Sequence, residues 1–128
     1  MTLDIMNVSF PIAYTVSANA EICAEYGTIS EMMNRIRDLR GTEQQDVICK
    51  TAAILIQAGC QRERVRAALE GVDPPKWPLI PDSETIKSAV EYCGLIELLN
   101  NIFDAIEEGV RQKIELKDSK KNEEQASK

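Results

Sequence analysis

The first hydrophobic pattern along the chain is an alternation near its start. Apolar residues occupy every second position of Val8–Val16. This period of two predicts a strand or an extended arm. The segment suits a sheet edge, because the interior Pro11 has no N–H to donate. With no second clear strand in the chain, it either pairs with a copy of itself, pairs with the preceding MTLDIM, or lies over the helices. The residues expected to be buried, and to mediate self-association if two copies pair, are Phe10, Ile12 and Tyr14.

Apolar residues then recur at helical spacing, and capping signals divide the chain into helices. Ser17 is the expected cap of a first helix that stops at Gly27. Thr28 and Glu31 have the spacing of a capping box, which starts a second helix that ends at Gly41. The chain therefore begins with two short helices after the extended segment.

A third helix is predicted to form the centre of the domain. A capping box at Thr42 precedes DVICKTAAILIQAG, which is apolar over most of its circumference, and a helix of that kind is buried nearly all round. A separate, shorter helix is expected over Gln61–Glu70. Its inward-facing residues are expected to be Val65, Ala68 and Leu69.

A stiff connector and a final helical region follow. GVDPPKWPLIPD holds four of the five prolines and is expected to be extended. Asp82 or Ser83 caps the final region, and Gly94 either breaks it into two helices or weakens one. One apolar stripe comprises Ile86, Ala89, Val90, Cys93, Ile96, Leu99, Phe103, Ile106 and Val110. A second set, which points elsewhere, comprises Leu95, Leu98 and Ile102.

Together these elements predict a mainly α fold. We expect one small domain of five to six helices over residues 1–114, with a short N-terminal β-strand or extended arm. The charged segment 115–128 has almost no apolar content and is expected to be a disordered tail. No run of 18 apolar residues is present, so no membrane span is expected. The N-terminus lacks the features of a signal peptide, which favours a cytosolic protein.

Charge and composition argue against most chemistry. The formal net charge is −6 and histidine is absent, which disfavours binding to nucleic acid and removes the commonest general base. No phosphate-binding loop or convergent carboxylate pair is present, so we expect no enzyme, no catalytic residue and no cofactor. The cysteines have no zinc-site spacing, so we expect no metal and free, reduced thiols. They are Cys23, Cys49, Cys60 and Cys93.

Three stretches carry a resemblance to a known family. They are VSFPIAYTVSANAEICAEYGTISEM, TAAILIQAGCQRE and PDSETIKSAVEYCGLIELLNNIFDAIEEG, within roughly residues 7 to 112. The order of these stretches and the length of the chain resemble those of the tail assembly chaperones of long-tailed bacteriophages and related prophages. The resemblance implies a small, mainly helical, non-enzymatic protein in the cytoplasm of the bacterial host. Its partner would be the tape-measure protein, whose apolar helices such chaperones keep soluble while tail-tube subunits assemble around it.

This resemblance implies a binding role for apolar faces. We place that role on the apolar surplus of the chain, namely Trp77, Leu79, Ile80, Leu95, Leu98 and Ile102. The tail-tube protein is a further expected partner, and a homo-oligomer is expected. The family also implies a longer frameshifted form, for which SKKN at Ser119–Asn122 could be encoded by a slippery, adenine-rich heptamer.

Two other functions remain open from the sequence. One is a small structural or adaptor protein of the phage head–tail region. The other is a helix-turn-helix regulator, because TISEMMNRIRDLRGTEQQDVI has that outline with three arginines. The net charge and the apolar third helix argue against the regulator.

Overall fold

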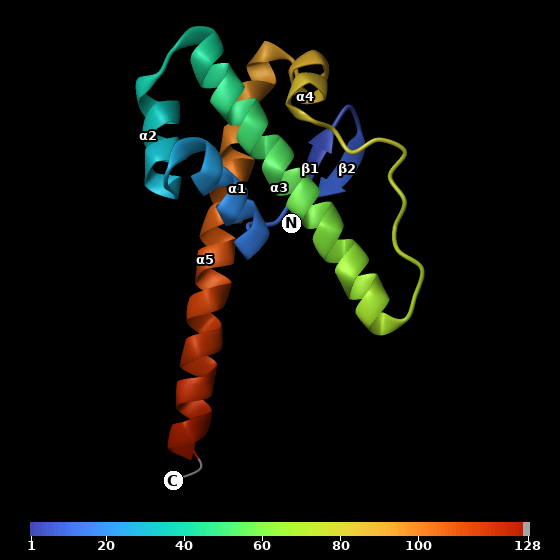
Figure 1. The fold of residues 1–128 in the computed structure, drawn as a ribbon, viewed down its shortest axis with the longest axis vertical. Helices are drawn as coiled ribbons and strands as arrows, with labels where there is room; N and C mark the ends of the chain where they lie inside the picture. The colour runs from blue at the N-terminus through green and yellow to red at the C-terminus, as the bar shows by residue number, and fades with distance from the viewer. Residues whose placement is uncertain (127–128) are drawn as a thin grey trace.

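The structure, a computed structural model, describes the backbone of residues 1–126 and the side chains of residues 1–111. Five α-helices follow an N-terminal two-stranded hairpin, as the mainly helical pattern predicted (Figure 1). The predicted disordered tail at 115–128 falls on residues whose side chains lie outside the description, and it stays a prediction. The elements are β1 (Thr2–Ile5), β2 (Val8–Pro11), α1 (Val16–Tyr26), α2 (Ile29–Asp38), α3 (Gly41–Glu70), α4 (Ser83–Ala89), the 3₁₀ turn η1 (Tyr92–Gly94) and α5 (Leu95–Ala126).

The third helix forms the centre of the domain, as predicted. Helices α1, α2, α4 and α5 and strand β2 all pack against α3, which runs diagonally through the molecule (Figure 1). Every helix contributes at least one fully buried side chain to a single core. These include Ile22, Met32, Leu55, Ile86 and Ile102.

The alternating segment pairs with the residues that precede it. β1 and β2 form an antiparallel hairpin in which Leu3 lies opposite Phe10. Met6 and Asn7 make the two-residue turn, both with positive φ, as tight hairpins of this kind require. The strand ends at Pro11, earlier than the expected Val16, because the next residues leave the hairpin for α3 and the Ala13 amide donates to the Leu55 carbonyl.

Helix α3 continues through the point where the sequence predicted a break. The expectation of a separate helix at Gln61–Glu70 is wrong, because α3 runs unbroken from Gly41 to Glu70. Gly59 serves a close approach between backbones. A Cβ at this position would lie 2.2 Å from the Pro11 carbonyl oxygen. A mid-helix glycine therefore marks the crossing of the arm over α3, where the sequence suggested a helix end.

The capping signals are confirmed in part. Thr28 accepts a hydrogen bond from the Glu31 amide, as the capping box predicted. The first helix begins one residue earlier than Ser17, with Thr15 as its cap. The predicted cap at Thr42 is wrong, because α3 already begins at Gly41 without a side-chain cap.

The last helical region buries the second apolar set in preference to the long stripe. Residues Val90 and Glu91 are extended and a 3₁₀ turn follows, so α4 and α5 do not share one helical phase and one stripe cannot run across both. Three members of the stripe, Cys93, Ile96 and Val110, are consequently exposed. The buried residues of α5 are Leu98, Ile102, Ala105 and Ile106.

Candidate binding surface on helix α3

The C-terminal part of α3 extends beyond the core. We call Gly41–Cys60 the proximal segment of α3 and Gln61–Glu70 the distal segment. Nearly all side chains of the distal segment are exposed, Ala67 being its one buried residue. Figure 1 shows this end of α3 standing clear of α1, α2 and α5. The expectation that Val65, Ala68 and Leu69 face inward is wrong, because all three are exposed. The exposed fractions of Val65 and Leu69 are 47% and 84%.

The exposed apolar residues of the distal segment continue a stripe that starts in the core. At 100° per residue, Ile54, Ala58, Val65 and Leu69 fall within about 60° of one another around α3. Ile54 and Ala58 are half-buried beside the core, whereas Val65 and Leu69 are exposed. We call these four residues the α3 stripe. Its spacings of four, seven and four residues keep the side chains on one face of α3, as in a helix that packs against another helix.

A groove lies along the α3 stripe, and we call it the α3 groove. Its volume is about 500 Å³. The start of α1 lines one part of it, Ile54, Ala58 and Val65 of the stripe line another, and Ile80 of the connector also contributes. Leu69, the last residue of the stripe, lies outside the lining. Its lining residues are Thr15, Ser17, Ala18, Glu21, Ile54, Gln57, Ala58, Gln61, Arg62, Arg64, Val65 and Ile80.

A second groove adjoins the first, in the fork where α3 and α5 diverge (Figure 1). We call it the fork groove; its volume is about 800 Å³. The extended arm and the stretch Ala105–Val110 of α5 line most of it. Because Thr15 and Arg62 line both grooves, the two are neighbours on one continuous surface.

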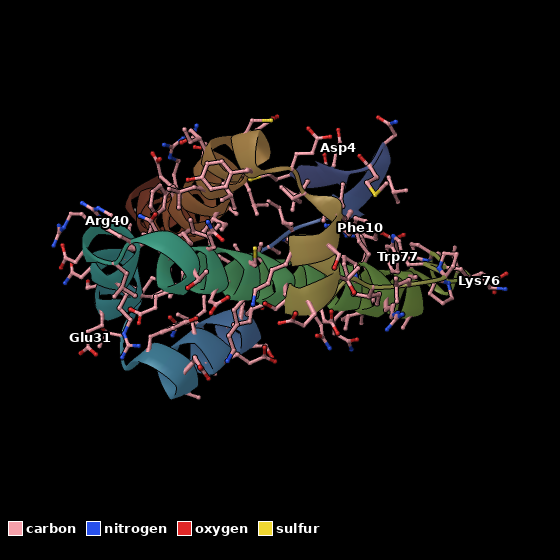
Figure 2. All side chains as sticks on the ribbon, turned by 90° about the horizontal axis from the view of Figure 1, so that it is seen from above. Asp4, Phe10, Glu31, Arg40, Lys76 and Trp77 are labelled. Atoms are coloured by element: carbon pink, nitrogen blue, oxygen red, sulfur yellow. The ribbon has the colours of Figure 1, made fainter. Side chains whose placement is uncertain are left out.

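The connector after α3 is held against the distal segment by an aromatic contact. The Arg64 guanidinium carbon lies 5.7 Å from the centroid of the Trp77 ring, within the range of a cation–π interaction. Trp77 is half-buried against the core cluster, and Figure 2 shows it beside the far end of α3. Of the predicted partner-binding residues in the connector, Ile80 lines the α3 groove and Leu79 is exposed. Trp77 packs on its own domain.

The partner-binding residues predicted on α5 lie mainly in the core. Leu98 is only 3% exposed, and Ile102 is also buried. Leu95 is half-buried against the same core. These side chains stabilise the fold, and a partner would reach Leu98 or Ile102 only if the core opened. The break at Val90 sets which face of α5 is buried, and a role of these residues in binding stays a prediction.

The residues predicted for self-association are used within the chain. Phe10 and Ile12 are buried in the core cluster, as expected. Tyr14 is half-buried, and its hydroxyl donates to the Asn19 side-chain oxygen. The prediction of burial is confirmed for the first two residues and partly for Tyr14. A homo-oligomer stays a prediction.

The cysteines differ in burial more than the sequence suggested. Cys49 and Cys60 are buried, and this burial raises the pKa of both thiols. Cys23 is half-buried, and Cys93 is exposed although its neighbours are apolar. In residues 1–111, where side chains are described, no cluster of three or more potential metal ligands occurs. Within the same range, no helix combines the length and apolar content that a bilayer span requires.

The grooves bear residues that the sequence analysis did not assign to a site. The arginines of QRERVR are exposed, and two of them, Arg62 and Arg64, line the α3 groove. The signal that could have found them is the stripe spacing across Gly59, which becomes visible once α3 is treated as one helix. Comparison with models of known protein families, with curated proteins and with solved structures finds no match to this chain.

Proposed function

We propose that this chain is a non-enzymatic tail assembly chaperone of a long-tailed phage or prophage. In this role it holds an apolar helix of the tape-measure protein in the host cytoplasm and supports assembly of the tail tube, whose protein is a further partner. The α3 stripe is the observation that carries this proposal. Val65 and Leu69 are exposed on a regular helix, next to a groove of about 500 Å³.

The stripe is suited to a helical client. Two helices pack when apolar side chains recur every three to four residues on facing surfaces. Fully covering a Leu side chain contributes about 1.5–3 kcal/mol, and Leu69 is almost completely uncovered. The exposed Val72 and Leu79 in the following connector extend the apolar surface available to a partner. A long apolar helix is the partner that uses such a surface best.

The two alternative functions fit the surface less well. In a helix-turn-helix regulator the N-terminal part of α3 would enter a DNA groove, but Val47, Ile48 and Ala52 on that part are buried in the core. A structural protein of the head–tail region could use the same stripe. The two roles differ in outcome, because a structural protein remains in the purified virion and an assembly chaperone does not.

Co-expression tests the proposed function. The chain is produced with the long, helix-rich protein encoded beside it, and a tag on one is used to retrieve both. We expect soluble co-retrieval, with the partner insoluble when expressed alone. If this chain elutes alone and its neighbour stays aggregated, the proposal is wrong.

Matched variants then locate the surface. We expect Val65→Glu with Leu69→Glu to abolish co-retrieval and to leave the helical circular dichroism unchanged, because both side chains are exposed. Ile96→Glu is the control, since Ile96 is 73% exposed on α5 and lines neither groove. Loss of retrieval in the control as well would show that general surface charge, rather than the stripe, governs binding.

A further inference from the structure

Arg62 differs from the other arginines because it makes no hydrogen bond, ion pair or ring contact with another of the described side chains. Within the described residues, the other six each contact an acidic group, a carbonyl oxygen, an amide or an aromatic ring. These six are Arg35, Arg37, Arg40, Arg64, Arg66 and Arg111. Arg62 lines both the α3 groove and the fork groove, and the carboxylate residue of the fork groove is Glu108.

The charge of the α3 groove is opposite to that of the whole chain. The chain carries a formal net charge of −6. Among the residues that line the α3 groove, Arg62 and Arg64 oppose a single carboxylate, Glu21. Helix α1 also begins at this groove, with no acidic residue in its first turn, so the positive end of its dipole is not neutralised there.

A second copy of this chain is a poor occupant of the stripe. If two copies packed through their α3 stripes about a two-fold axis near the middle, the two Arg62 side chains would meet each other. Like charges in contact are unfavourable, and neither guanidinium would gain a partner. A helix of another protein with acidic residues beside its apolar face would cover the α3 stripe and give Arg62 a carboxylate partner.

We infer that the α3 groove selects an amphipathic helix that carries Asp or Glu beside its apolar face, with one carboxylate bound by Arg62. This inference rests on the proposed function, because it takes the α3 stripe as the surface for a client helix. A guanidinium binds a carboxylate through two parallel hydrogen bonds. Pairing between Arg62 and one carboxylate therefore determines which client helices bind and in which register. Val65 and Leu69 contribute the apolar contact.

Three synthetic helical peptides test the inference. They share one apolar face and differ only beside it, where they carry Glu, Gln or Lys. Binding to the full chain is measured by fluorescence anisotropy at low and at physiological salt. We expect the Glu peptide to bind about tenfold or more tighter than the Gln peptide, the Lys peptide to bind weakest, and added salt to reduce the difference.

Charge reversal at Arg62 sharpens the test. In Arg62→Glu we expect the order of the Glu and Lys peptides to invert, and in Arg62→Gln we expect the two to bind alike. Arg37→Glu is the matched control, because it changes the net charge equally on the exposed surface of α2, and the preference for the Glu peptide should persist.

The outcomes separate the two proposals. If all three peptides bind equally through Val65 and Leu69, the charge preference is wrong and the proposed function stands. If none binds, neither the groove nor the proposed function holds on this surface. If the chain instead dimerises in a manner abolished by Leu69→Glu, a second copy covers the stripe and the inference is overturned.

Discussion

The two segments of α3 have different surroundings although they belong to one continuous helix. The proximal segment is enclosed by α1, α2, α4, α5 and β2. The distal segment is covered on one side only, where Trp77 and the connector lie against it. Both segments contain apolar residues at helical spacing. Apolar residues at helical spacing therefore indicate that one face of the helix will be covered. They do not indicate whether the same chain or another protein covers that face.

The crossing of the arm at Gly59 marks the end of the enclosed part of α3. On the proximal side the arm, α1 and α5 all approach the helix. Beyond Gly59 α5 diverges from α3 (Figure 1). The α3 groove spans this point, since its lining residues on α3 run from Ile54 to Val65, and Arg62 of the distal segment also lines the fork groove. If this crossing positions both the core and the grooves, a change at Gly59 has the largest effect of any single substitution that we consider.

Gly59→Val is expected to destabilise the fold by about 3–5 kcal/mol, or to prevent folding. A Cβ there would lie 2.2 Å from the Pro11 carbonyl oxygen and 2.7 Å from the Ile12 amide nitrogen. These are backbone atoms, so the arm itself must move. Urea denaturation followed by circular dichroism measures the effect.

Gly94→Ala is the control for that experiment. Its new Cβ would meet the Val90 side chain at 3.2 Å, which a small rotation relieves. We expect a change within about 1 kcal/mol. If Gly59→Val proved equally mild, the arm would be able to leave α3 without loss, and the boundary between the two segments would need another explanation.

Much of this fold could be predicted from local signals. The alternating residues, the cap at Thr28 and the apolar third helix all reflect short-range chemistry, and the structure confirms them. The misassignments concern long-range packing. Gly59 has the appearance of a helix end in the sequence, because the close approach of Pro11 comes from a segment nearly fifty residues away.

The candidate site was harder to predict than the fold, for a related reason. Leu98 and Leu69 are both leucines at helical spacing, and no local property distinguishes the buried one from the exposed one. The break at Val90 and Glu91 decides which face of α5 is buried. The continuity of α3 past Gly59 decides that Leu69 projects into solvent. Both depend on where elements pack, so the sequence suggested Leu98 as the partner surface and Leu69 as core.

The pair Leu98 and Leu69 tests this reversal directly. Leu98→Ala is expected to cost about 2–5 kcal/mol, because it removes a buried side chain and leaves a cavity. Leu69→Ala should change stability by less than about 0.5 kcal/mol, because the side chain is 84% exposed. Urea midpoints of the two variants, compared with the parent, measure the difference. Equal effects would mean that another part of the chain covers the distal segment in solution.

The smallest expected effect on stability comes from removing the contact between the connector and the distal segment. Trp77→Ala removes the cation–π contact with Arg64, worth about 0.5–1 kcal/mol at an exposed site. Cys60 lies one turn before Arg64, and burial raises the pKa of its thiol and slows its alkylation. With the cover removed, we expect the Cys60 pKa to fall toward its usual value and its alkylation to accelerate about tenfold. Mass spectrometry after iodoacetamide treatment at pH 8 measures the rate at each cysteine.

Cys49 is the internal reference for this experiment, because it is buried near the middle of the proximal segment, whereas Cys60 is the last residue of that segment. Its alkylation rate should not change in Trp77→Ala. Leu79→Ala is the matched variant in the connector, since Leu79 is 62% exposed, and it should leave both rates unchanged. If Cys49 and Cys60 accelerate together, Trp77 stabilises the whole domain, and the connector does not open independently of the core. Acceleration at Cys60 alone means that the connector can open locally and expose more of the surface that we propose for the client helix.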